Sequence, residues 1–318
     1  MKRTLLLLTA LSLLPLHAAV KTHWVKGVSE SGGWYDSDKA GPHESNLCWA
    51  ACAANMTAWW QDRNADTAGK TQAPTGKDVW ETMRKSLRNN PDCAQSGTNW
   101  WFSGQLQPRA NASNASAGNY YQELMSGNSF QAKLLRAPNY GTELSFSELM
   151  VELIDSGHVI SLGIQPVEER RLMGGTHWIT LWGVDYDESK KVVTRVYLTD
   201  SDDYQPNVAQ YQKGLFTADC TWAEDVVAPG NRIFSSLIFR NEIGWFKDNT
   251  AITSVVALPQ DADFITEQDR KAHEQKEAEE PKNAKSAKKG KKTKADKTAK
   301  TEKEDKKKKK EKKEKKKK

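Results

Sequence analysis

Beyond residue 19 the sequence lacks any hydrophobic run long enough to cross a bilayer as a helix, so no transmembrane segment is expected. A cysteine that could carry a lipid anchor is also missing near that position. Residues 1–19 have a basic start at Lys2 and Arg3, a short leucine-rich stretch and small residues at the end. This pattern is typical of a cleaved secretory signal peptide. We therefore expect a protein that is secreted, periplasmic or bound at the cell surface.

The end of the chain lacks aromatic and branched aliphatic residues, and all twelve tryptophans precede it. Residues 266–318 hold 24 Lys and Arg against 12 Asp and Glu, a net charge of +12, whereas the whole chain carries +6. Such a composition cannot bury enough apolar surface to fold, so residues 261–318 are predicted to be a disordered, lysine-rich tail. Two roles stay open for it: a solubilising extension, or contact with anionic surfaces. Nucleic acid is not an expected partner, because the preceding residues are acidic and contain no recognition motif.

The four cysteines do not show the paired spacing of a zinc site, so the sequence predicts neither a metal nor another cofactor. In an oxidising compartment, a disulfide could join one pair among Cys52, Cys93 and Cys220. Cys93 and Cys220 are the preferred pair, because both lie in irregular, polar sequence.

Residues 20–260 suit one catalytic domain with a helical half followed by a β-rich half. A helix that is apolar on nearly all sides is predicted from Leu47 to about Arg63, with Asn46 as its N-cap. Residues 64–140 are polar and are interpreted as an irregular, surface-forming insert with one helix near 78–87.

The second half contains one helix and several strands. In "SFSELMVELIDSG", Ser145 and Glu148 form a capping box and Gly157 ends the helix. Buried strands and a hairpin are predicted to follow, over residues 158–164, 176–187 paired with 192–200, 232–240 and 251–259. This order indicates an α+β fold.

Cys48 is the best candidate nucleophile, because the first turn of a helix favours the thiolate. Cys52 lies one turn deeper and is expected to be buried. His177 follows the flexible "MGGT" at the start of a strand, where it can act as general base and acid. Asp200 or Asp202, at the end of the partner strand, could orient its ring. The other histidines are weaker candidates, at the start of a buried strand, in irregular N-terminal sequence or in the tail: His158, His23, His43 and His273.

Three segments in the same order resemble the IdeS/Mac family of secreted immunoglobulin-degrading cysteine endopeptidases, which have a papain-like fold: "WYDSDK" (34–39), "LCWAACAANMTAWW" (47–60) and "HWITLWGVDYD…YLTDSDD" (177–203). The resemblance implies Cys48 as nucleophile, His177 as base and acid, Asp200 as the residue that orients the imidazole, and Asp202 as a supporting acid. It also implies that Lys39 helps to stabilise the oxyanion. From its spacing alone, Lys39 would instead be interpreted as a solvated loop cation.

The sequence therefore predicts a papain-like α+β fold, in which a central buried helix carrying Cys48 packs on an antiparallel sheet carrying His177 and Asp200. The leading function is an exported cysteine endopeptidase with a protein substrate, for which IgG is a candidate. Two alternatives stay open: another papain-like peptidase or amidase acting on leader peptides or cell-wall cross-links, and a catalytically silent module that binds a host protein.

Overall fold

The computed structural model describes residues 20–105, 118–122, 132–136, 146–202, 214–240 and 249–260. The predicted signal peptide and the predicted tail lie outside these ranges, as do Ser145 and His273. The domain boundaries at residues 20 and 260 therefore stay predictions. Among the described residues, no helix combines the length and the apolar character needed to cross a membrane.

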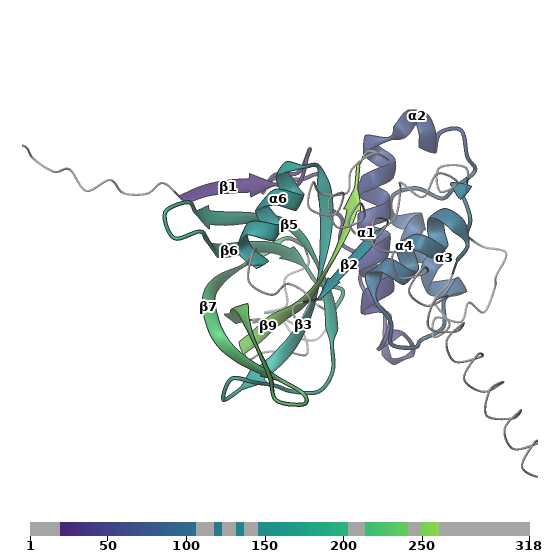
Figure 1. The fold of residues 1–318 in the computed structure, drawn as a ribbon. Coiled ribbons are helices and arrows are strands. Elements are labelled where there is room, and N and C mark those ends of the chain that lie inside the picture. Colours follow the sequence, from purple (N-terminus) through teal and green to yellow (C-terminus); the bar gives the residue numbers. More distant parts are fainter. Residues whose placement is uncertain are drawn as a thin grey trace, which may run out of the picture. The chain divides into compact units, whose positions relative to one another are not determined.

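Within these described ranges, nine strands form one sheet, most of whose pairs are antiparallel. Six of them close into a barrel in the order β5, β6, β7, β8, β9 and β3, with β3 pairing back to β5. The strands are β1 (Val20–Trp24), β2 (Lys133–Arg136), β3 (His158–Glu168), β4 (Arg171–Leu172), β5 (His177–Asp187), β6 (Val192–Thr199), β7 (Phe216–Ala228), β8 (Arg232–Arg240) and β9 (Asn249–Pro259). Figure 1 shows the long strands curling around a common interior.

Bulges allow these strands to bend. The pairing register shifts at Gly163/Ile164 in β3 and again within β5 and β7, and an extra residue in one strand increases its local bend and twist. Gly163 also permits close approach, because a Cβ atom there would lie 2.2 Å from the Ser254 hydroxyl on β9. Strand β3 can therefore pair with both β5 and β9 and close the barrel.

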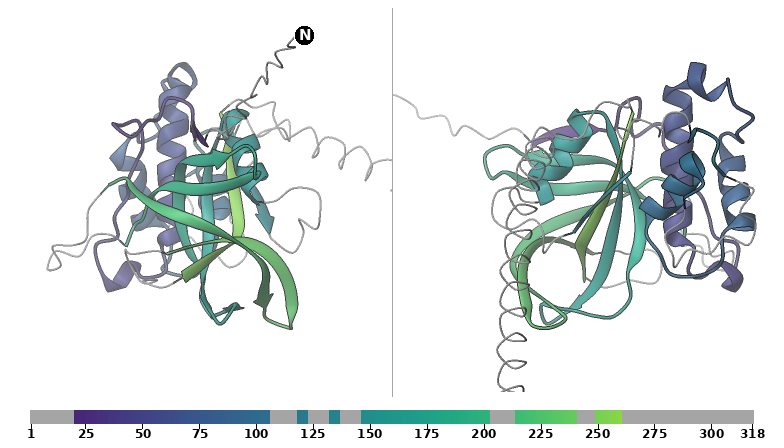
Figure 2. Two further views of the ribbon diagram at one scale, coloured as in Figure 1. Left: turned by 90° about the vertical axis from the view of Figure 1, so that its left-hand side faces the viewer. Right: turned by 45° about the vertical axis from the view of Figure 1, so that its right-hand side comes forward.

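The helices of the first half lie beside the barrel (Figure 1). Helix α1 (Cys48–Arg63) lies between the barrel and helices α3 (Lys77–Ser86) and α4 (Ala94–Ser103), and Figure 2 shows the same arrangement from two further directions. Its small residues allow this double packing: a Cβ at Gly97 on α4 would lie only 2.6 Å from that of Ala53 on α1. Helix α1 is therefore buried on nearly all sides, as its composition predicted.

The predicted fold class, a papain-like α+β fold with a central helix packed on a sheet, is wrong. The structure is dominated by a largely antiparallel β-barrel, and α1 lies outside it. The physical reason is the pairing of β3 with β9, which lie about ninety residues apart in the chain and join the two ends of the sheet. Local hydrophobic patterns identify strands, but they contain no information about such closure.

The predicted surface insert is also wrong for residues 94–103. These residues form α4, and Trp100, Trp101 and Phe102 are almost completely inaccessible to solvent. The expected helix near residues 78–87 is confirmed as α3. Further short helices are η1 (Pro42–Glu44) and α2 (Ala65–Ala68).

Most predicted elements of the second half are confirmed. The expected helix is α6 (Phe146–Asp155), after which Gly157 adopts a positive φ of 83°. The predicted hairpin is β5 and β6, and the two later strands are β8 and β9. Strands β1, β2, β4 and β7 were not predicted.

Candidate active site

Cys48 is the first residue of α1 and is 7% exposed. The predicted cap is wrong: Leu47 is the N-cap and makes no side-chain capping bond, while the Asn46 backbone N–H donates to Asn89 Oδ1 at 2.7 Å. The thiol therefore lies at an uncapped helix N-terminus, which favours negative charge. Burial raises the pKa of the Cys48 thiol, but the hydrogen bond and charge of His177 and the charge of Lys39 outweigh burial, so the pKa is below its ordinary value.

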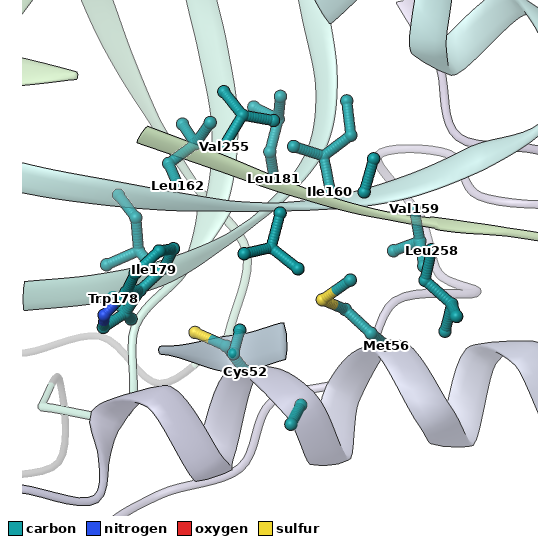
Figure 3. Packing of buried hydrophobic residues seen from close by; sticks show 14 of the residues in the cluster. Cys52, Met56, Val159, Ile160, Leu162, Trp178, Ile179, Leu181, Val255 and Leu258 are labelled. Atoms are coloured by element: carbon teal, nitrogen blue, oxygen red, sulfur yellow. The ribbon is translucent and has the colours of Figure 1, made fainter. Parts of the chain in front are cut away.

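Cys52 has a different environment one turn along the same helix. It is 2% exposed, and Figure 3 shows its sulfur facing apolar side chains of the barrel, including Trp178 and Ile179. Burial raises the pKa of the Cys52 thiol far above its ordinary value. Cys52 is therefore a core residue, whereas Cys48 is the thiol whose pKa is lowered.

His177 and Asp200 are adjacent because of the β5–β6 hairpin. The register pairs Thr180 with Thr199, so the start of β5 lies beside the end of β6. His177 Nε2 lies 2.7 Å from Asp200 Oδ1, and Asp200 is fully buried. Because Nε2 is engaged with Asp200, Nδ1 is the ring nitrogen available to Cys48.

The two groups stabilise each other's charge. Burial lowers the pKa of the His177 imidazole, but the charge and hydrogen bond of Asp200 and the contact with Cys48 raise it to well above its ordinary value. Burial raises the pKa of the Asp200 carboxyl. The charge and hydrogen bond of His177 lower this pKa by more than burial raises it, so the pKa lies below its ordinary value. The site therefore favours a thiolate–imidazolium pair, the reactive form of a catalytic cysteine.

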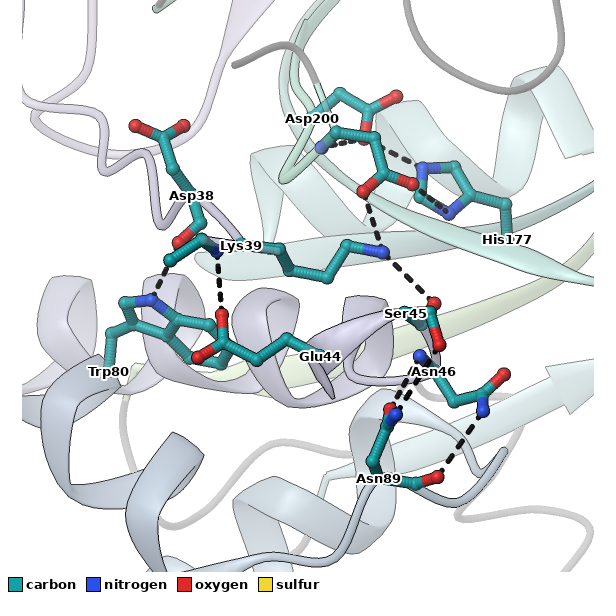
Figure 4. Close-up of polar contacts among 11 residues, drawn as sticks. Asp38, Lys39, Glu44, Ser45, Asn46, Trp80, Asn89, His177 and Asp200 are labelled. Carbon is teal, nitrogen blue, oxygen red and sulfur yellow. Dashed lines mark hydrogen bonds and ion pairs between the residues drawn. The ribbon is translucent and has the colours of Figure 1, made fainter. Parts of the chain in front are cut away.

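Lys39 and Asp202 form the other side of the cluster. Lys39 Nζ lies 2.6 Å from Asp202 Oδ1 and donates to the Ser45 carbonyl at 3.1 Å. Asp202 Oδ2 also lies 3.7 Å from His177 Nδ1. Figure 4 shows the Lys39 side chain reaching from its loop toward Ser45 and the His177–Asp200 pair. Lys39 is 8% exposed, so the interpretation of a freely solvated loop cation is wrong.

The structure thus brings all five residues predicted for the site into one cluster: Lys39, Cys48, His177, Asp200 and Asp202. Their catalytic roles stay predictions.

A set of supporting contacts was missed at the sequence level. Glu44 Oε2 accepts from the Ala40 backbone N–H at 2.7 Å, and its other oxygen lies 3.2 Å from Arg84 on α3. Trp80, also on α3, donates to the Asp38 carbonyl at 2.8 Å. These contacts fix the loop that carries Lys39 against α3 (Figure 4). The sequence contains no local signal for them.

The other described histidines lie in other environments. His158 is buried, with Nδ1 3.0 Å from the Ser156 hydroxyl, as expected for a structural residue. His23 lies on β1 rather than in irregular sequence, and its Nδ1 is 2.8 Å from Asp155. His43 is exposed in η1.

The predicted Cys93–Cys220 disulfide is contradicted, because all four cysteines are free thiols. Cys93 is the N-cap residue of α4, and Cys220 lies on β7. Burial raises the pKa of both thiols, that of Cys220 to about 12. Neither thiol shares the activation of Cys48.

Among the described residues, only His177, Asp200 and Asp202 place possible metal ligands together, within 4.8 Å of one another. The ammonium group of Lys39 already lies against Asp202, so a metal ion there would meet a positive charge at short range. The arrangement suits proton transfer better than metal binding.

Comparisons with known proteins show a similarity at the level of the family. The sequence profile of the family described as Mac 1 matches residues 116–222, which include His177, Asp200 and Asp202. An IgM protease of Streptococcus suis (strain P1/7) is 24% identical over 229 residues. The match covers 58% of this chain and 19% of the relative, so the chain spans about a fifth of the length of the protein it matches. These two matches confirm the resemblance of the chain to the IdeS/Mac family.

Proposed function

We propose that this protein is an exported cysteine endopeptidase that cleaves a protein substrate through Cys48, His177 and Asp200. The observation that carries the proposal is the position of an activated thiol at a helix N-terminus beside a histidine whose Nε2 lies 2.7 Å from a buried carboxylate. Nucleophile, base and orienting group are the parts that covalent hydrolysis of a peptide bond needs.

In the proposed reaction the Cys48 thiolate attacks the peptide carbonyl carbon and forms a tetrahedral oxyanion. The intermediate collapses, the C–N bond breaks, and the His177 imidazolium gives its proton to the leaving amine. Water then attacks the thioester while His177 accepts one of its protons, the C–S bond breaks to restore the Cys48 thiolate, and the carboxylic acid product leaves and ionises. Asp200 holds the ring orientation and the imidazolium charge throughout.

Lys39 supports the oxyanion in this proposal. Its ammonium group is held by Asp202 and the Ser45 carbonyl near the start of α1. A fixed positive charge close to the carbonyl oxygen stabilises the transition state more than the ground state. The backbone N–H of Cys48, at the uncapped helix N-terminus, is the second donor.

Immunoglobulins are the proposed substrate class. The support is the resemblance to the IdeS/Mac family and the similarity to an IgM protease. The proposed site of action is outside the cytoplasm, after removal of residues 1–19.

The test is incubation of the purified chain with serum, IgG and IgM, followed by sequencing of new N-termini. Cys48→Ala should abolish cleavage and keep the fold, whereas the matched control Cys52→Ala should keep cleavage and lose about 1 kcal/mol of stability. Cleavage by a folded Cys48→Ala protein would overturn the mechanism. If the protein cleaved leader peptides or cell-wall cross-links but no serum protein, immunoglobulins would be wrong as the substrate class and these alternatives would take their place. Fractionation of producing cells tests export.

A further inference from the structure

Thr199, the last residue of β6, directly precedes Asp200 and is 1% exposed. Its hydroxyl donates to the Tyr35 carbonyl at 3.0 Å and accepts from Trp182 Nε1 at 2.9 Å. Asn55 Nδ2 lies 3.5 Å away on a third side. A single buried hydroxyl therefore contacts three separate segments of the chain.

Each of these segments carries a residue of the candidate active site. Asn55 lies on α1, which begins at Cys48, and Trp182 lies on β5, which begins at His177. Tyr35 lies in the segment that leads to Lys39. The Thr199 hydroxyl thus lies where helix α1, the β5–β6 hairpin and the segment from Tyr35 to Lys39 meet.

A backbone contact strengthens this arrangement. The Lys39 N–H donates to the Ser201 carbonyl at 2.9 Å. Asp200 is therefore flanked by two residues, Thr199 and Ser201, that both bond to the segment between Tyr35 and Lys39. Without the hydroxyl only the second of these two bonds remains, and the segment can shift relative to Asp200. A displacement of about 1 Å in a reactive site can cost about a hundredfold in rate.

We propose that Thr199 is a positioning residue: its hydroxyl holds the segment from Tyr35 to Lys39 and the backbone at Asp200 in the register that places Lys39 and His177 around Cys48. The inference rests on the proposed function, but its test includes a measurement that needs no protein substrate.

The test compares Thr199→Val with the control Thr180→Val. Thr180 is fully buried opposite Thr199 in the β5–β6 pair, and its hydroxyl accepts from Asn55 at 3.0 Å. Both substitutions replace a buried hydroxyl by a methyl group, so both should lower the thermal midpoint, by about 2–6 °C. Only Thr199→Val removes the bond to the Tyr35 carbonyl. Thr199→Ser keeps a hydroxyl and should restore the native behaviour.

The first measurement is the alkylation rate of Cys48 by iodoacetamide against pH, read by peptide mass spectrometry so that Cys93 does not interfere. Thr199→Val should move the pH midpoint upward by about one unit, which makes the reaction near pH 6 about tenfold slower. Thr180→Val and Thr199→Ser should keep the wild-type midpoint. If Thr199→Val is too unstable to purify, Thr199→Ala removes the same hydroxyl and is measured instead.

The second measurement is turnover of a reporter peptide, for which Thr199→Val should lower kcat at least tenfold with KM changed less than about twofold. Equal alkylation midpoints for Thr199→Val and Thr180→Val would overturn the positioning role. A wild-type protein that alkylates at low pH but cleaves no peptide would overturn the proposed function alone. A wild-type midpoint at the ordinary thiol value would overturn both.

Discussion

Substitution of Asp200 by Asn changes the charge beside His177 with almost no change in shape. Asp200 is fully buried and its Oδ1 lies 2.7 Å from His177 Nε2, so water screens this interaction very little. A neighbouring opposite charge at such range moves a pKa by about 1–3 units, and each unit corresponds to about 1.4 kcal/mol. Asp200→Asn should therefore lower the pKa of His177 by about 1–3 units.

The direction in which the pH profile shifts follows from the charges that Cys48 and His177 need for activity. The reactive form needs the Cys48 thiolate and the His177 imidazolium together, so the acid limb of the pH profile reports Cys48 and the alkaline limb reports His177. Because the pKa of His177 is raised, the imidazolium form persists at pH values above its ordinary titration range. The folding stability that this charge contributes is lost as pH rises through the raised pKa. Without the Asp200 charge, the alkaline limb should move to lower pH by about 1–3 units.

The assay is kcat/KM against pH for a peptide that the wild-type protein cleaves. Asp202→Asn is the matched control, because Asp202 lies 3.7 Å from the ring and is partly exposed, and we expect its alkaline limb to move by less than about one unit. An unchanged alkaline limb for Asp200→Asn would refute the assignment of Asp200. Equal shifts in both variants would mean that the two carboxylates share the role.

Three further predictions concern the oxyanion, the core and the tail. Lys39→Met should lower kcat by about 10²–10³ while KM changes little, and a normal kcat in steady-state assays would remove Lys39 from the mechanism. Trp101→Ala should cost about 3–5 kcal/mol in urea unfolding, because the side chain is completely buried, and a loss below about 1 kcal/mol would contradict its place in the core. A chain that ends at Gln260 should keep the hydrolysis of small peptides and lose salt-sensitive retention on anionic beads. Equal retention of both chains would leave the tail as a solubilising extension.

Elements with a strong local pattern were predictable from the sequence. The β5–β6 hairpin has two strand-like runs around a short turn, and α6 has a regular apolar stripe and is followed by Gly157. Helix α4 was missed because Gly97, Thr98 and Asn99 make its composition polar, although the "WWF" run at residues 100–102 was a signal of burial. Strand β7 was missed because its exposed and buried positions do not alternate cleanly.

The residues of the candidate site also fall into those that the sequence could predict and those that depend on tertiary contacts. Cys48, His177 and Asp200 could be proposed from chemistry and local structure, since a helix start and a hairpin bring such groups forward. Lys39 was indicated only by the family resemblance, because its partners lie in sequence far from it or depend on a loop conformation. The role inferred for Thr199 depends entirely on tertiary contacts, so no sequence pattern could have indicated it.

The closure of the barrel by its last strand also has a consequence for the order of events during synthesis. Strand β9 fills the gap between β3 and β8, and it places Leu258 near Met56 of α1 (Figure 3). A growing chain that has not yet reached residue 249 leaves β3 with an open edge and this part of α1 uncovered. Because non-local pairings form late in folding, the packing of α1 against the barrel is complete only when nearly all of residues 20–260 have been made. For the proposed peptidase, this order delays completion of the site until synthesis is nearly finished, which limits cleavage of other proteins by incomplete chains.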